Sequence, residues 1–571
     1  MHAWYIILAG LSTVWAVRAW RATRPKDPAE GWLALAVIAA GAAKLWLASG
    51  QVQFALPADP FDDRLFLRLA TFLLQGRWLG PYDQLTLAKG PFYPLFLAGT
   101  SAMGMPITIA QNLLYIAAAW MFVVALRPLR LRGWTRMLLL LAIVLCPALA
   151  DTGAFVRAWR QAVWPALVLL SVAGVLGFAL RADRGNRLRA AWALAAGLSM
   201  GAMWLDREEA VWTLPMLAAL LAPLLRRSPR LPSVGWLCAP FLVAGVAVAA
   251  VALQNLRAYG FWGIVEFRDN AFVSAYSAIS RVKPQDPVRR IPVTFAARER
   301  IYAVSPAFAS LRHEIEQGIG AAFMKVTQDA MGIPASEHEI GGGWMMWTLR
   351  EAVANTGRAK SAQGSRAFYG QLAREVDSAC DDGRLPAGPP RHTLRPDLYP
   401  GSVARVVQSA RDAFNLILSC PYNPEPIASF GAPDDLAWVQ RITREPVAPA
   451  DAALAAAKGG PRRLAILWFT LRLYQGAMRW LVPAAGALWL LSVGRALRRR
   501  EIPGLLLLGT ALLLGLAGNI AVVALVDALS FGAINPGYLG AGVPLAVCFV
   551  GIVLVDWAEW CSAKVRPPLQ T

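Results

Sequence analysis

The sequence predicts an all-α, polytopic membrane protein that carries an inserted, mostly helical extracytoplasmic domain. Of its 571 residues, 57% are hydrophobic and only 16% are charged, which is too apolar for an ordinary soluble protein. Apolar runs of about 20 residues, the length that crosses a hydrocarbon core as a helix, recur from end to end. Basic residues cluster in the short connectors between these runs, which is typical of cytoplasmic loops.

The apolar runs predict about eleven membrane crossings. They divide the chain into a membrane part (1–256), an extracytoplasmic part (257–463) and C-terminal membrane helices (464–571). The first run lacks an obvious cleavage site, so we interpret it as a membrane helix and not as a removed signal peptide. The expected spans are 3–18, 31–49, 106–126, 137–151, 163–180, 190–205, 210–225, 234–255, 480–496, 503–525 and 537–556.

The basic connectors predict the topology. Placing them inside gives strict alternation, with the N-terminus outside and the C-terminus inside. We therefore expect a multi-pass protein of the cytoplasmic membrane, with 257–463 facing the periplasm or exterior. The net charge of +20 resides largely in these connectors, while the long polar region is close to charge balance, which argues against nucleic-acid binding. The outer loops are then 50–105, 152–162, 206–209, 257–479 and 526–536.

The first outer loop is rich in charge for a connector between two apolar segments. Its segment Pro57–Pro94 combines the acidic pair Asp62-Asp63, a helix-like run, a Gly/Pro/Tyr turn and a Lys-Gly-Pro step. The apolar stretches Leu65–Leu74 and Pro91–Met105 are too short to cross a membrane. We expect both to form interfacial or re-entrant helices.

Helix signals recur in the polar region 257–463, and no strand series is evident. Ser305-Pro306 reads as an N-cap followed by proline at the first helical position. Three longer stretches end at a glycine or before a proline. These stretches are Trp344–Asn355, Ser361–Asp382 and Ser402–Leu418.

Two features of the C-terminal half stay open. A disulfide between Cys380 and Cys420 is chemically allowed outside the cytoplasm, but the sequence does not give the distance between them. The run Leu464–Trp480 fits either an interfacial helix or part of a longer, tilted span.

Charged residues from three outer loops are the candidate functional residues, because charge near a membrane is costly to desolvate. All three loops join membrane helices on one side, so their side chains can converge on one cavity. Carboxylates can deprotonate a hydroxyl, and arginine or lysine can hold a phosphate as charge develops on it. The candidates are Asp62, Asp63 and Lys89; Asp151, Arg157 and Arg160; and Asp206, Arg207, Glu208 and Glu209.

Each candidate also has a structural alternative. An aspartate before the Leu65 run can cap a helix, and Lys89 can extend to lipid headgroups. Arg157 and Arg160 can likewise meet headgroups, and residues 206–209 can form an internally paired turn. The Ser336–Glu339 segment carries one histidine between two acids, which fits a solvated loop better than a metal site.

This layout resembles the GT-C superfamily of polyprenyl-phosphate-sugar-dependent membrane glycosyltransferases. Members have many spans, an acidic pair in the first outer loop and interfacial helices in that loop. The resemblance maps the catalytic acid onto Asp62 or Asp63, and the run Lys89–Pro94, which contains Tyr93, onto a basic-then-proline step near the donor phosphate. The chain departs from the family in lacking the Trp-Trp-Asp signature of oligosaccharyltransferases and in placing its soluble part before the last spans.

The resemblance implies transfer of a sugar from a polyprenyl-phosphate donor to a glycan, lipid or protein hydroxyl, with inversion at the anomeric carbon. Lys89, Arg157, Arg160 and Arg207 would bind the donor phosphate, while Asp206, Glu208, Glu209 and Tyr93 would contact or support the acceptor. The carboxylates permit a divalent metal but do not require one. Two rivals remain: an oligosaccharide ligase or polymerase that uses a diphosphate-lipid donor, and a lipid or glycan transporter, which predicts broken helices and repeated halves.

Overall fold

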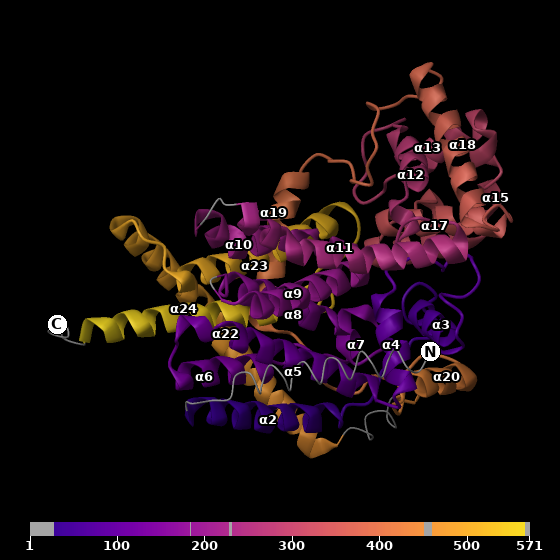
Figure 1. Ribbon diagram of the computed structural model, residues 1–571. Coiled ribbons are helices and arrows are strands. Elements are labelled where there is room, and N and C mark those ends of the chain that lie inside the picture. The colour runs from indigo at the N-terminus through magenta and orange to yellow at the C-terminus, as the bar shows by residue number, and fades with distance from the viewer. Residues whose placement is uncertain (1–27, 183, 228–230, 450, 452–459, 566–571) are drawn as a thin grey trace.

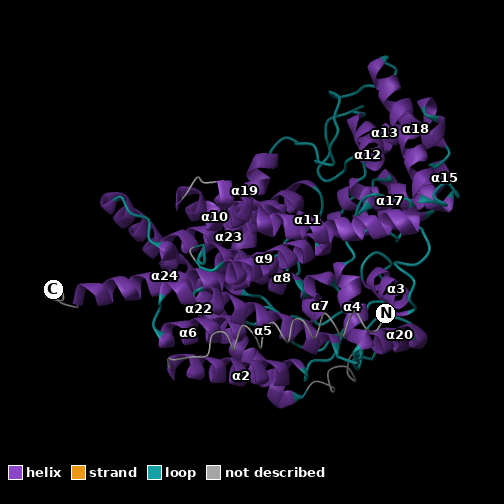
Figure 2. Cartoon of the chain, viewed as in Figure 1, coloured by secondary structure: helices purple, strands orange, loops and turns teal. Residues whose placement is uncertain are grey.

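The computed structural model describes residues 28–182, 184–227, 231–449, 451 and 460–565. Helices and loops make up this part of the chain, and its β-structure consists of two isolated bridges, Gln53–Val447 and Val282–Ala387 (Figure 2). The all-α prediction is therefore confirmed for the described residues.

Eight helices in the described residues are long and apolar enough to span a membrane, so the chain is an integral membrane protein. The expected count of about eleven is too high for this part of the chain, and the first expected span, 3–18, lies outside it. The eight helices are α2 (Pro28–Ala48), α5 (Ile107–Ala125), α8 (Trp164–Ala179), α9 (Asn186–Asp206), α11 (Leu231–Tyr259), α22 (Pro461–Arg499), α23 (Gly504–Leu529) and α24 (Gly542–Val565).

Proline explains why two expected spans are short. The run 137–151 yields α6 (Gly133–Val144), which ends shortly before Pro147, because proline disfavours helical backbone in the residue before it. The run 210–225 yields a 3-10 helix, η3 (Glu208–Thr213), and then α10 (Leu214–Arg227), which starts next to Pro215. The segment Leu464–Trp480, for which the sequence allowed two interpretations, is part of α22, a continuous helix of 39 residues.

Short helices occupy the loops. The expected interfacial stretches of the first outer loop form α3 (Asp63–Leu74) and α4 (Phe92–Ala102). Other short elements are η1 (Arg127–Leu129), α7 (Thr152–Phe155), η2 (Arg160–Ala162), η4 (Glu266–Arg268), α14 (Pro306–Ala309), α15 (Arg312–Glu316) and η5 (Ala335–Glu337).

The helices expected in the polar region are present. Ser305 caps α14, its hydroxyl accepting a hydrogen bond from the Phe308 backbone N–H at 3.1 Å, as the Ser-Pro step predicted. The longer helices are α12 (Asn270–Arg281), α13 (Phe295–Val304), α16 (Ile319–Met331), α17 (Gly342–Asn355), α18 (Ala362–Asp381), α19 (Ser402–Ser419) and α20 (Pro433–Thr443).

Of the eight candidate spans, α8 is the most buried. α8 contacts α5 and α9, and α9 in turn contacts α11 (Figure 1). Small residues permit this close approach: a Cβ added at Gly177 of α8 would lie 1.9 Å from the Trp192 ring of α9. Such positions are typical of helix interfaces in membranes, where packing replaces the hydrophobic effect.

The region 257–463 contributes helices to several parts of the molecule. α12, α13, α15, α17 and α18 gather in one cluster at the upper right of Figure 1. By contrast, α19 packs against α23, and α20 packs against α3 and α4 of the first outer loop.

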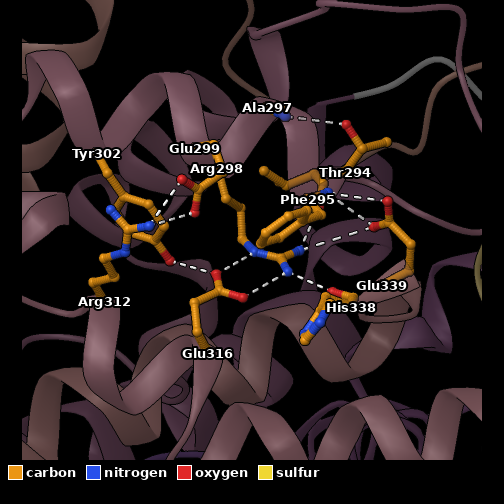
Figure 3. Close-up of polar contacts among 11 residues, drawn as sticks. Thr294, Phe295, Ala297, Arg298, Glu299, Tyr302, Arg312, Glu316, His338 and Glu339 are labelled. Atoms are coloured by element: carbon orange, nitrogen blue, oxygen red, sulfur yellow. Dashed lines mark hydrogen bonds and ion pairs between the residues drawn. The ribbon is translucent and has the colours of Figure 1, made fainter. Parts of the chain in front are cut away.

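Arg298 of α13 organises the interior of this cluster. Its fully buried guanidinium donates to both carboxylate oxygens of Glu316, at 2.8 and 3.1 Å, and Tyr302 donates to the same carboxylate at 2.7 Å (Figure 3). Glu339 accepts from the Phe295 backbone N–H at 3.0 Å. The Ser336–Glu339 segment thus takes part in a structural network, and no group of three or more His, Cys, Asp or Glu side chains suited to a metal occurs in the described residues.

The disulfide left open above does not form. Cys380 and Cys420 are both free thiols, and the Cys420 thiol donates to the backbone carbonyl of Ile417 at 3.3 Å.

A buried ion pair attaches the first outer loop to the soluble helices. The Arg350 guanidinium on α17 lies 2.5 Å from the Glu266 carboxylate on η4, and both side chains are about fully buried. Arg350 also donates to the backbone carbonyls of Gln84 and Thr86, each at 2.6 Å. Tyr82 donates to Glu266 at 2.8 Å, so the two charged residues hold the loop segment that leads to Lys89.

We expect Arg350→Gln to lower the free energy of unfolding by about 3–5 kcal/mol, because it leaves the Glu266 carboxylate buried without its cation. Thermal unfolding of the detergent-solubilised protein measures this loss. Arg384→Gln is the matched control, since the Arg384–Asp382 pair is exposed and should contribute about 0–1 kcal/mol. Equal unfolding midpoints for both variants would contradict the anchoring role.

Candidate functional site

The charged residues predicted from the three outer loops converge at one end of the membrane helices. Asp62 and Asp63 lie at the start of α3, and Lys89 lies just before α4. Arg157 and Arg160 lie between α7 and α8, and residues 206–209 join α9 to η3. Figure 1 shows α3, α4 and α7 at the same end of the bundle.

Asp62 and Lys89 form an ion pair across the first outer loop, in which the Lys89 ammonium donates to Asp62. Asp62 occupies the N-cap position of α3, yet its side chain makes no capping hydrogen bond. Lys89 lies over the rings of Phe66 and Trp347, at 5.5 and 5.7 Å from their centroids. The helix-capping and headgroup alternatives therefore do not describe this pair, since each residue directs its charge to the other.

Asp63 and Arg157 form a second pair. Arg157 Nε lies 2.9 and 3.0 Å from the two Asp63 carboxylate oxygens, and its Nη2 lies 3.6 Å from Asp59. Asp63 retains only 1% of its side-chain exposure, whereas Asp62 retains 27%. Asp62 is thus the member of the acidic pair that a ligand can reach.

The third outer loop is tied to the second by Arg160. Its Nη1 donates to the Asp206 backbone carbonyl at 2.9 Å and lies 3.8 Å from the Glu208 carboxylate. Arg207 lies 3.4 Å from Glu209 and sits over the rings of Trp164 and Tyr538. A cavity of about 100 Å³ opens beside Arg207 and Glu209.

Several buried polar atoms of this loop pair have no hydrogen-bond partner within the described part of the chain. They include both carboxylate oxygens of Asp206, Oε1 of Glu208, Nε of Arg160 and Nη1 of Arg207. Buried polar groups in proteins are nearly always paired, so this concentration of unpaired donors and acceptors indicates a site built for a polar ligand or solvent.

A glycine brings the first and third outer loops into contact. A Cβ added at Gly90 would lie 2.0 Å from the backbone carbonyl oxygen of Leu205, the residue before Asp206. Gly90 follows Lys89 directly, so the close backbone approach sets Lys89 beside the end of α9. This gives a physical reason for the Lys-Gly-Pro step that the sequence suggested.

Tyr93 lies in the buried layer between α4 and α3, below the acidic pair. Its side chain is fully buried, its hydroxyl accepts from Gln111 at 3.4 Å, and its ring packs edge-on against Phe66 at 5.2 Å. Burial raises the pKa of the Tyr93 hydroxyl, and the nearby carboxylates of Asp63 and Asp206 act in the same direction, so this residue lies beneath α3 and close to the acidic pair.

The charges of the site influence one another. Burial alone would raise the pKa of Asp62, but Lys89, Arg160 and Arg157 outweigh it and lower the pKa below its ordinary value. Burial raises the pKa of Asp63 to about 7, with Arg157 opposing. Arg207 and Arg160 outweigh burial at Glu209 and hold its pKa at about 2. Asp62 and Glu209 are therefore carboxylates at neutral pH.

One predicted candidate, Asp151, has a structural role, and the structure adds three residues that were not among the candidates. Asp151 caps α7, accepting from the backbone N–H groups of Ala154 at 2.8 Å and Asn423 at 2.9 Å. Asp59, three residues before Asp62, joins the Arg157 cluster and could have been found by its position in the same loop. Trp347 and Tyr538 come from distant segments, and no local signal identifies them.

The comparisons with known proteins add the following findings. A scan against protein-family models and a search of curated proteins find no match. Among solved structures, the chain is similar to ArnT from Cupriavidus metallidurans in the apo state, with 16% identity and a TM-score of 0.32 over 95% of this chain and 82% of that one. It is also similar to ArnT bound to undecaprenyl phosphate, with 13% identity and a TM-score of 0.30 over 94% and 81% of the two chains.

ArnT is a GT-C polyprenyl-phosphate-sugar-dependent glycosyltransferase. At such TM-scores the similarities carry no argument about function, and the proposals below rest on the residues of this chain.

We expect Gly90→Ala to destabilise the protein by about 1–3 kcal/mol, because the added methyl group collides with a backbone atom that cannot rotate away. The thermal unfolding midpoint and the protease sensitivity of the first outer loop measure the effect. Gly532→Ala is the control, since nothing lies within 4 Å of a Cβ at that position. An unchanged midpoint in Gly90→Ala would show that the two loops do not need this contact.

Proposed function

We propose that this chain is a glycosyltransferase of the GT-C type, which transfers a sugar from a polyprenyl-phosphate donor to a hydroxyl group of a glycan, lipid or protein. The observation that carries the proposal is the Asp62–Lys89 pair, an accessible carboxylate held beside a lysine and close to Arg160. A base for a hydroxyl and cations for a phosphate are the two requirements of this reaction. The active site would face the outside of the cytoplasmic membrane.

In the proposed reaction, Asp62 accepts the proton of the acceptor hydroxyl. The acceptor oxygen then attacks the anomeric carbon, and the bond between that carbon and the phosphate oxygen breaks in the same displacement. The electron pair of the broken bond goes to the phosphate, so polyprenyl phosphate leaves with an added negative charge. A single displacement inverts the configuration of the anomeric carbon.

Lys89, Arg160 and Arg207 compensate the negative charge that develops on the phosphate. Arg160 and Arg207 each retain a buried N–H group that has no partner among the described residues, and such groups can donate to phosphate oxygens. Since the chain itself supplies these cations, the proposed displacement does not depend on a divalent metal.

Asp63 has a different role in the proposal. Both of its oxygens face Arg157, and its side chain is buried, so it positions Arg157 and the start of α3. Glu208 and Glu209 orient Arg160 and Arg207 through their carboxylates, and Asp206 orients Arg160 through its backbone carbonyl. The acceptor would approach through the open side of Asp62.

The first test compares Asp62→Asn with Asp63→Asn in the purified protein, using polyprenyl-phosphate sugars as donors. We expect Asp62→Asn to lower kcat by about 10²–10⁴-fold, the usual contribution of a general base, with little change in the unfolding midpoint. Unlike Asp62→Asn, the Asp63→Asn variant should lower the unfolding midpoint, because Arg157 then lacks its buried carboxylate. If both variants transferred sugar as fast as the wild type, the base would have to be another residue.

The pH profile provides a second test. Because Lys89, Arg160 and Arg157 lower the pKa of Asp62, the acid limb of kcat/KM in the wild type should lie below the ordinary range of an aspartate. Lys89→Met removes the main opposing cation, so burial should raise the pKa of Asp62 and move the acid limb toward neutral pH. Lys89→Arg keeps the cation and should leave the limb low. An acid limb that stays in place in Lys89→Met would rule out Asp62 as the group that titrates.

A further inference from the structure

A second polar cleft lies away from the site, between the end of α12 and the segment 386–398, which we call the strap. Its volume is about 390 Å³, and its charged lining consists of Arg281, Lys283, Arg391, Arg395 and Asp397. The strap has no helical structure and leads from the end of α18 to the start of α19 (Figure 1).

Positive charge exceeds negative charge along the lining of this cleft, where Arg281 is paired with Asp377 and Asp381 at 3.2 and 2.6 Å. Lys283 and Arg391 share one carboxylate, that of Asp397, at 2.6 and 2.7 Å. Arg395 is exposed and forms no ion pair within the described residues, and the buried Nε of Arg391 has no hydrogen-bond partner there. A concave surface with this excess attracts anions.

The positive surface continues toward the membrane helices. Burial lowers the pKa of Arg290, and the neighbouring cations Arg289 and Arg405 act in the same direction. Arg290 also lines a small cavity next to the cleft, together with Arg391 and Arg395. Arg290 lies 3.5 Å from the Asp527 carboxylate of α23, so the exposed cations of this basic surface are Arg289, Arg395 and Arg405.

Contacts with α23 place the cleft at the level of the membrane boundary. The Tyr399 hydroxyl, just after the strap, donates to the backbone carbonyl of Ala528 at 3.1 Å, and Ser409 donates to Asp527 at 2.7 Å. Both partners lie in the last turn of the spanning helix α23. The strap thus ends where a membrane span ends.

Large apolar side chains are exposed beside the cleft. Leu398, Val403 and Val407 keep 56%, 73% and 65% of their surface exposed on the strap and on α19, which packs against α23 with its other face. An apolar surface alongside a span and a basic cleft at its end match the two parts of a lipid, its acyl chains and its headgroup.

We propose that this cleft binds the phosphate-bearing headgroup of an anionic lipid, in the membrane leaflet on the side of the site. Arginine recognises phosphate through paired N–H groups, and basic pockets at a membrane boundary bind anionic headgroups. No residue that lines the cleft also lines the cavity beside Arg207 and Glu209. Gly342 and Met346 of α17 line the adjoining cavity, whereas Trp347 of the same helix contacts Lys89.

Native mass spectrometry of the detergent-solubilised, full-length protein tests the proposal. The protein is titrated with dioleoyl phosphatidylglycerol, with phosphatidylcholine as the zwitterionic comparison. The test variants are Arg395→Gln alone and combined with Lys283→Gln. The control Arg374→Gln/Arg384→Gln removes two exposed cations from α18 and the turn after it, so it changes the net charge equally.

We expect phosphatidylglycerol to bind the wild type more tightly than phosphatidylcholine. Each cation removed should weaken that binding about fivefold, so the double test variant should lose on the order of tenfold or more, while the control keeps wild-type affinity. Equal affinities for the test and control variants would overturn the proposal. The proposal would also be overturned if millimolar glycerol phosphate displaced the lipid from the same residues, because the ligand would then be a free phosphate ester.

Discussion

Desolvation of charge is the constraint on which the arrangement of the outer loops depends. A carboxylate or guanidinium removed from water costs several kcal/mol unless a partner of opposite charge meets it in good geometry. Here the partners of the acidic pair come from other parts of the chain: Asp62 meets Lys89, and Asp63 meets Arg157. The Asp62–Lys89 pair therefore closes the first outer loop on itself, and the Asp63–Arg157 pair links that loop to the second.

The same constraint explains how the soluble helices take part in the site. The buried Glu266–Arg350 pair holds the segment before Lys89, and Trp347 on the same helix contacts Lys89 itself. α17 therefore contacts Lys89 directly and also holds the segment that precedes it. A domain that local sequence patterns describe only as helical proves to be a structural support of the first outer loop.

Much of the fold follows from local signals in the sequence. Apolar length identifies most spans, and cap or stop residues place α14, α17, α18 and α19 within a few residues. The charges at the ends of the spans also include most residues of the candidate site. Pairing within the site could not be predicted in this way, because Asp62 and Lys89, or Asp63 and Arg157, meet only through tertiary packing. The same holds for α19, whose sequence reads as a soluble helix but whose partner is α23.

The long helix α22 has a mechanical consequence. At 1.5 Å per residue it is about 58 Å long, roughly twice the thickness of the hydrocarbon core. Near one end, Arg463 meets Ser49 after α2, and near the other, Arg495 pairs with Asp556 of α24. A helix of this length accommodates a thicker or thinner bilayer by changing its tilt. Its two ends then move in opposite directions, so the thickness of the surrounding membrane acts on both faces of the protein at once.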